Sequence, residues 1–240
     1  MEISDALKEL YGDYYLDERV LIKRRIAARQ TLDHLNSILP CKNYRSIIDI
    51  GAGDGSLLEE LNEINVSGEL HAVEISESGW ASIQEKKLDK VHSVNQFDGY
   101  NISSKDNAYG LGLAIHVLEH VEHERVFIRE MARTCEYIYI EVPLELTLSI
   151  KKNIDVGSQF GHVNFYNAST FQNLLESSGL EVLAFKQFSP SLEYETFLDG
   201  VIKGTVKYII RKWALKISPK AASLLITYMG GAYCRRRCRG

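Results

Sequence analysis

The sequence contains no apolar run of about 18 or more residues, the length that a membrane-spanning helix needs, so no transmembrane segment is expected. Its start also lacks a basic segment followed by an apolar one, and we expect no signal peptide. The four cysteines form no C-x-x-C pair and have no accompanying histidine spacing, which argues against a zinc site or a disulfide framework. We therefore expect reduced thiols, no bound metal and a cytoplasmic protein.

Prolines are also few, four in 240 residues, and no low-complexity linker or internal repeat divides the chain. This length suffices for one well-buried core and is short for two ordinary domains. Charge is unevenly distributed, because residues 201–240 carry ten Lys or Arg and no Asp or Glu, whereas the rest carries 18 basic and 32 acidic residues. The acidic body argues against a nucleic-acid partner, and the basic end predicts a local anionic contact.

Short β-rich runs alternate with helical patterns through most of the chain. Apolar residues recur at helical spacing in 18–39, and Pro40 ends that run. Consecutive apolar residues in IIDI and YIYI are typical of strands buried on both faces. This alternation predicts an α/β fold with a parallel, doubly wound sheet and helices on both faces. Strands are expected at 46–50, 70–75, 91–97, 111–115, 137–142 and 181–188.

The most informative segment is IIDIGAGDGSLLEEL, residues 47–61. A strand runs into Gly51, Gly53 and Gly55 and then directly into a helix. Glycines let the backbone turn sharply and approach a ligand closely, and the unpaired N–H groups of the helix N-terminus offer it hydrogen bonds. A dinucleotide fingerprint would require glycine where Ser56 stands, so a NAD-dependent oxidoreductase is the weaker alternative.

An acidic residue follows the loop at the sequence separation expected for a ribose-binding carboxylate. Glu74 comes at the end of the second predicted strand, 23 residues after Gly51. A carboxylate there can accept hydrogen bonds from both hydroxyls of a ribose. The alternative, a simple glycine turn and a surface glutamate, is disfavoured by the combination of strand, loop, helix and acid.

These segments resemble the class I S-adenosylmethionine-dependent methyltransferases of the small-molecule or sugar type. IIDIGAGDG looks like their first motif and HAVEIS like their second, and DNAYGLGLAIHVLEHV (106–121) is similar to their fourth-strand segment with its L-E-H sequence. IYIEVP and GHVNFYNASTFQNLLESSGLEV (161–182) look like the fifth strand and a later helix–strand unit. The resemblance covers about residues 45–185 and implies a Rossmann-like, mostly parallel seven-stranded sheet with an antiparallel last strand.

We expect one methyltransferase domain over 1–240. Its parts are an N-terminal helical lid or cap (1–40), a cofactor-binding core (45–189), a basic helical insert (190–222) and a last strand (223–236). In the lid, Tyr11, Tyr14 and Tyr15 could cover the cofactor or simply pack.

The resemblance implies S-adenosyl-L-methionine as the cofactor and S-adenosyl-L-homocysteine as the product. The glycine loop would line the methionine end of the cofactor, and Phe97 and Asp98 would flank its adenine. The implied cofactor-binding residues are Asp49, Gly51, Ala52, Gly53, Gly55, Glu74, Ile75, Phe97, Asp98, Ile115 and His116.

The acceptor is less defined. Methyl transfer requires alignment of nucleophile, methyl and sulfur, and a hydroxyl acceptor also requires a base. His116 and His162 are the catalytic candidates, although each could instead serve packing, and His120 is expected to be a structural partner of the following helix. AIHVLEH lacks the N-P-P-Y type sequence with which similar enzymes hold planar amines. We therefore expect a small-molecule or glycan acceptor, with a hydroxyl of a sugar, a lipid-linked molecule or another metabolite favoured.

The basic segment 201–217 predicts an amphipathic helix. Its apolar stripe could pack on the domain, or the helix could cap an acceptor pocket. It could also lie on an anionic membrane, which would place the protein peripherally on the inner membrane face. The stripe consists of Ile202, Val206, Ile209 and Trp213.

One alternative to the enzyme stays open, namely a non-catalytic protein that binds S-adenosylmethionine. The identity of the acceptor and the oligomeric state also stay open.

Overall fold

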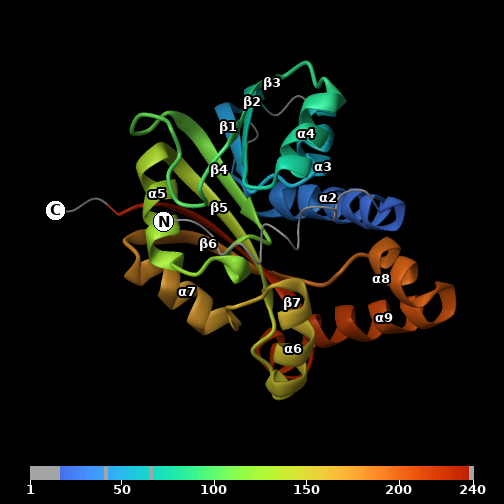
Figure 1. The fold of residues 1–240 in the computed structure, drawn as a ribbon. Helices are drawn as coiled ribbons and strands as arrows, with labels where there is room; N and C mark the ends of the chain where they lie inside the picture. Colours follow the sequence, from blue (N-terminus) through green and yellow to red (C-terminus); the bar gives the residue numbers. More distant parts are fainter. Residues whose placement is uncertain (1–16, 41–42, 65–66, 238–240) are drawn as a thin grey trace.

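The structure is a computed structural model and describes residues 17–40, 43–64 and 67–237. Its centre is a seven-stranded sheet in the order β3-β2-β1-β4-β5-β7-β6 (Figure 1). Strands β1 to β5 pair in parallel, whereas β7 runs antiparallel to both β5 and β6. The expected fold class is confirmed. The strands are β1 (Tyr44–Ile50), β2 (Ser67–Glu74), β3 (Val91–Gln96), β4 (Tyr109–Ile115), β5 (Cys135–Leu144), β6 (Leu180–Phe188) and β7 (Tyr228–Arg236).

Helices connect and cover these strands. The predicted lid is described only from residue 17 onward, and its three tyrosines lie outside the described residues. The helices are α2 (Glu18–Ile38), α3 (Ser56–Glu63), α4 (Glu77–Lys86), η2 (Leu118–His120), α5 (Glu124–Thr134), α6 (Ile150–Gly157), η3 (Ser158–Phe160), α7 (Ala168–Ser177), α8 (Leu192–Asp199), α9 (Val201–Ile217) and α10 (Pro219–Leu225).

The core has two apolar layers, one on each face of the sheet. Neighbouring residues of β1 point to opposite faces, so Ile47 joins one layer and Ile48 the other. The Ile47 layer is closed by apolar residues of α2, α3 and α4, and the Ile48 layer by those of α5 and α7. Burial on both faces explains why the central strands are continuous apolar runs.

The strand order places the carboxyl ends of β1 and β4 at the switch point of the sheet. Chain connections leave β1 toward β2 on one side, and β4 begins the other half. Ligands of doubly wound sheets bind outside the strand ends at such a point. The fold therefore puts the glycine loop after β1 beside the segment that follows β4.

The last strand contains Gly230 and Gly231, residues that usually weaken a strand. Here they allow close approach, because a Cβ on Gly230 would lie 2.9 Å from Leu144 Cδ2 and one on Gly231 2.9 Å from Phe188 Cε2. The strand begins at Tyr228 rather than 223, since α10 continues to Leu225 after its Ser218 N-cap.

Three helices, α8, α9 and α10, lie between β6 and β7. Gly204 of α9 packs against the backbone of Glu195 in α8, where a Cβ would lie 2.5 Å from the Glu195 carbonyl oxygen. The predicted apolar stripe of α9 does not pack on the domain, because Ile202 is 84% and Trp213 57% exposed. Packing was therefore the wrong alternative for this stripe. Among the described helices, none is long and apolar enough to cross a membrane.

Candidate functional site

The link between β1 and α3 is a glycine loop in which three residues have left-handed backbones. The φ angle is +79° at Gly51, +59° at Gly53 and +77° at Gly55, where side chains with a Cβ are strained. A Cβ on Gly51 would also lie 2.6 Å from Val117 Cγ2, and one on Gly55 2.8 Å from Ile83 Cγ1. The loop therefore requires glycine for both conformation and space.

Glu74 meets this loop at the carboxyl end of β2. Its Oε2 accepts a hydrogen bond from the Gly53 N–H at 2.7 Å. Its Oε1 accepts from the Ser76 N–H at 2.9 Å and the Ser76 hydroxyl at 2.8 Å. These contacts hold a buried carboxylate against the loop. The structure thus brings together the two elements that the sequence separates by about two dozen residues.

The remaining predicted cofactor residues lie at or just after the carboxyl ends of the parallel strands. Ala52 follows β1, Ile75 follows β2, and Ile115 is the last residue of β4. Phe97 and Asp98 follow β3, and the Asp98 carboxylate accepts from the backbone N–H groups of the two residues at 100 and 101. All of them share the edge of the sheet that carries the glycine loop.

Asp49 lies inside β1, one residue before the strand ends, and its side chain is buried. Burial raises its pKa to about 7; the Arg24 charge opposes the rise, and the Glu74 and Asp54 charges add to it. At neutral pH this carboxyl is therefore poised between its neutral and charged forms.

His116 begins the segment after β4, with a left-handed backbone at φ +55°. Its Nδ1 lies 3.2 Å from Glu119 Oε1, and its Nε2 lies 3.6 Å from Glu141 Oε1. Burial alone would lower the pKa of His116, but the hydrogen bonds and charges of these two glutamates raise it to about 10. The ring is therefore charged at neutral pH, which favours a hydrogen-bond donor over a base.

A cavity of about 400 Å³, here called the acceptor pocket, opens beside His116. It brings His116 together with His162, which lies 46 positions later in the chain. Basic side chains of α2 and α9 also line it, namely Lys23, Arg24, Lys207 and Arg211. A larger hollow of about 740 Å³ between α2, β6 and α9 contains none of the predicted site residues.

A family model described as "Methyltransferase domain" matches residues 22–184. The chain belongs to this methyltransferase family. The resemblance of its motifs to the class I S-adenosylmethionine-dependent methyltransferases is confirmed. No curated protein matches the sequence.

Solved structures share the fold of this methyltransferase at low sequence identity. A chain from a Haloferax volcanii complex between the Trm112 methyltransferase activator and a methyltransferase has a TM-score of 0.64 at 12% identity, with 86% of this chain and 89% of that chain covered. Geranyl diphosphate C-methyltransferase of Streptomyces coelicolor has 0.61 at 12% identity, covering 88% and 75%. Phosphoethanolamine N-methyltransferase 2 of Haemonchus contortus has 0.62 at 16% identity, covering 88% and 53%.

The methyltransferase has a site residue that the sequence analysis missed, Glu141 of β5. Its Oε2 lies 2.9 Å from His34 Nδ1 and accepts from the Tyr139 hydroxyl at 2.6 Å. Burial would raise its pKa, but hydrogen bonds from His116 and His34 lower it to about 2. The signal was present in the sequence, because a charged residue inside the apolar run YIYIEV requires buried partners.

Proposed function

We propose that this methyltransferase binds S-adenosylmethionine between the glycine loop and Glu74 and methylates a small molecule held in the acceptor pocket. The observation that carries the proposal is the 2.7 Å hydrogen bond from the Gly53 N–H to the Glu74 carboxylate. This contact between the loop and the acid supports a ligand that both of them bind. Two of the similar structures, the Streptomyces coelicolor and Haemonchus contortus enzymes, contain S-adenosylhomocysteine, which supports the same use of this fold.

The residues at this strand edge fit the cofactor. The loop has no side chains at its three glycines, so its backbone can approach a ligand closely. Glu74 is held in place by Ser76 and can accept from ribose hydroxyls. When bound, S-adenosylmethionine supplies a methyl group already activated on a sulfonium. The protein then has to orient the acceptor and exclude water.

The acceptor pocket favours a small molecule that carries a hydroxyl and an anionic group. Its four basic side chains can attract phosphate or carboxylate, although three of them also contact carboxylates of the protein. Lys207 and Arg211 contact Glu195 at 2.8 and 3.0 Å, and Arg24 contacts Asp54 at 2.5 Å. His116 lines this pocket with both ring nitrogens directed at carboxylates, so it contributes positive charge rather than a further N–H to an acceptor oxygen. A phosphorylated sugar or a lipid-linked metabolite fits this description.

Calorimetric titration with S-adenosylhomocysteine, followed by transfer of labelled methyl to fractionated small molecules, tests the proposal. One equivalent of ligand should bind, and label should appear in a small anionic product. Binding without any methyl transfer would support the non-catalytic alternative. If S-adenosylhomocysteine does not bind, the proposed cofactor site is wrong.

The affinity for S-adenosylhomocysteine should depend on pH through Asp49. Its carboxyl lies beside the loop, and its pKa is about 7. The ligand's ammonium group would favour the charged carboxylate, so binding weakens as pH falls. Between pH 8 and pH 6 the affinity should fall by about 10-fold, the effect of one linked proton. Calorimetry across this range measures it, with Asp49→Asn as the variant that should flatten the curve; an equally steep curve in that variant would assign the proton elsewhere.

The exposed stripe of α9 supports a peripheral contact with an anionic membrane. Apolar side chains beside lysines are typical of interfacial helices. Flotation should recover the protein with phosphatidylglycerol vesicles and much less with phosphatidylcholine vesicles. The double variant Ile202→Asp, Trp213→Asp should stay in solution, whereas Val126→Asp, at an exposed position of α5, should float like the wild type. Wild-type protein that fails to float would contradict the membrane contact.

A further inference from the structure

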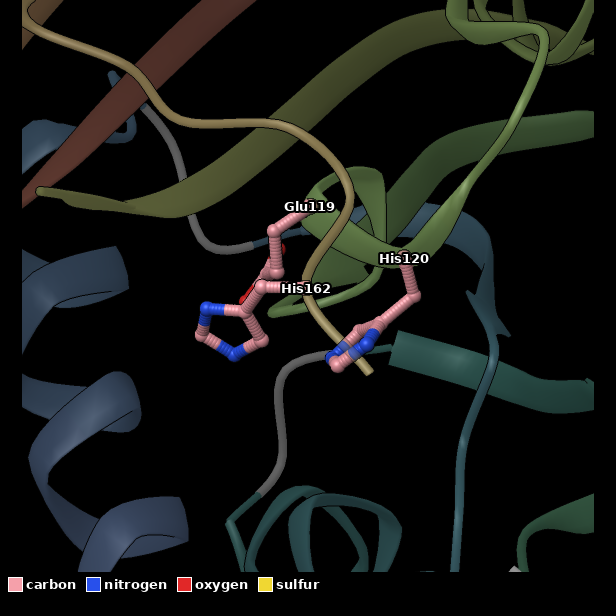
Figure 2. Close-up of side chains that lie close together, drawn as sticks. All are labelled: Glu119, His120 and His162. Atoms are coloured by element: carbon pink, nitrogen blue, oxygen red, sulfur yellow. The ribbon is translucent and has the colours of Figure 1, made fainter. Parts of the chain in front are cut away.

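Three side chains with metal-ligating atoms lie close together in the wall of the acceptor pocket. Glu119 and His120 come from η2, and His162 comes from the loop after η3. Each offers a ligand atom, and these atoms lie within 4.8 Å of one another. Figure 2 shows the two imidazole rings side by side on separate chain segments, with Glu119 beside His162. All three residues line the acceptor pocket.

The hydrogen bonds of both histidines set the tautomer that a metal requires. His120 Nδ1 lies 3.1 Å from the Gly161 carbonyl oxygen, and His162 Nδ1 lies 2.8 Å from Glu145 Oε2. Both partners only accept, so each Nδ1 carries the proton and each Nε2 carries the lone pair. Metal-ligating histidines are typically oriented by this kind of bond to a carbonyl or carboxylate.

Glu119 supplies the second, independent observation. Its side chain is 1% exposed. Its Oε1 contacts His116, but its Oε2 is buried without a hydrogen-bond partner among the described residues. A buried carboxylate oxygen without a partner lowers the stability of the fold, because no hydrogen bond replaces those it made to water. A cation between this oxygen and the two histidines would satisfy it.

We propose that Glu119, His120 and His162 bind one divalent transition-metal ion, and that its open coordination positions take an oxygen of the acceptor. Two histidines and one carboxylate leave such positions open, and this donor set suits zinc and neighbouring first-row ions. Ligands at about 2.0–2.1 Å from a tetrahedral ion lie about 3.4 Å apart, so atoms that lie up to 4.8 Å apart need to approach by up to about 1.4 Å. Coordination of an acceptor oxygen by the ion rests on the proposed function, whereas binding of the ion to the protein does not.

Metal uptake by the untagged full-length protein tests this directly. After removal of metal with a chelator, Co²⁺ is titrated by visible absorption and Zn²⁺ by calorimetry. One equivalent should bind, with the absorption bands of a low-symmetry, nitrogen-ligated site. His162→Gln should weaken binding by at least about 10-fold. Glu119→Gln should do the same, while His92→Gln, at an exposed histidine of β3, should leave it unchanged.

Two further measurements make the result decisive. Thermal unfolding checks that each variant is folded, and if Glu119→Gln is not, His162→Gln on its loop decides alone. S-adenosylhomocysteine affinity should be unchanged in His162→Gln, which separates this proposal from the cofactor site. Lack of saturable uptake at one equivalent, or wild-type uptake by folded His162→Gln, would overturn the metal site and leave the proposed function standing.

Discussion

Glu74→Ala is expected to lower the affinity for S-adenosylhomocysteine by at least about 30-fold, or about 2 kcal/mol. Two losses add up. The variant removes the acceptor for the ribose hydroxyls, and it frees the Gly53 N–H that Glu74 Oε2 holds at 2.7 Å. Charge-assisted hydrogen bonds to a buried carboxylate contribute about 1.5–3 kcal/mol each, so loss of even one exceeds the error of calorimetry.

The matched control is Glu77→Ala. Glu77 lies three residues later in the first turn of α4 and is exposed. Its removal costs a favourable charge at the helix N-terminus and touches no part of the loop. The control should bind like the wild type. A folded Glu74→Ala protein with wild-type affinity would mean that the glycine loop and the acid do not share a ligand, and the proposed cofactor site would be wrong.

Gly51→Ala is expected to abolish measurable cofactor binding and to lower the free energy of unfolding by about 2–5 kcal/mol. The new Cβ would sit at a φ of +79°, which costs about 1–2 kcal/mol. It would also lie 2.6 Å from Val117 Cγ2, so either the loop or the segment after β4 must move. Both are parts of the proposed site, and their displacement is why binding should suffer more than folding.

Gly179→Ala is the control that separates the effect of backbone strain from the effect of a steric clash. Gly179 also has a positive φ, +97°, but a Cβ there would meet nothing within 4 Å, and the residue lies just before β6. This control should lose only the strain energy of about 1–2 kcal/mol and should bind S-adenosylhomocysteine normally. Denaturant unfolding and calorimetry on the same preparations compare the two variants. Equal losses of binding in both would show that general destabilisation, rather than the loop, controls the affinity.

The two histidine candidates differ in a way that bears on the chemistry. His116 is fixed as a donor by two glutamates, whereas His162 has a single carboxylate on Nδ1 and faces the acceptor pocket. If the acceptor needs a base, we therefore expect it on the His162 side of the pocket. A metal ion held there would lower the pKa of a coordinated hydroxyl, so that solvent water could accept the proton in place of a protein base.

Several features could be predicted from the sequence because they depend on local rules. Continuous apolar runs predict buried parallel strands, and three closely spaced glycines between a strand and a helix predict the ligand-binding loop. Glu74 was found because its distance from the loop is fixed by one helix and one strand. The helix at 201–217 was found from its period, and its bounds match α9.

Other features follow from contacts between distant segments. The sequence showed an amphipathic stripe in α9 but could not show that α8 would pack on the opposite side at Gly204 and leave the stripe exposed. Likewise, Gly230 and Gly231 are unusual residues for a strand, and only the place of β7 between β5 and β6 shows why side chains are excluded there.

The sequence by itself determined the family, the doubly wound sheet and the elements of the proposed cofactor site, because each is encoded in spacing along a short stretch of chain. Only the tertiary structure decided which side chains meet around the acceptor pocket. His34 and Glu141 are 107 positions apart, and His120 and His162 are 42 apart, yet each pair meets at one end of the sheet. Contacts between side chains so distant in the chain depend on how whole elements pack, and no local pattern in the sequence records them.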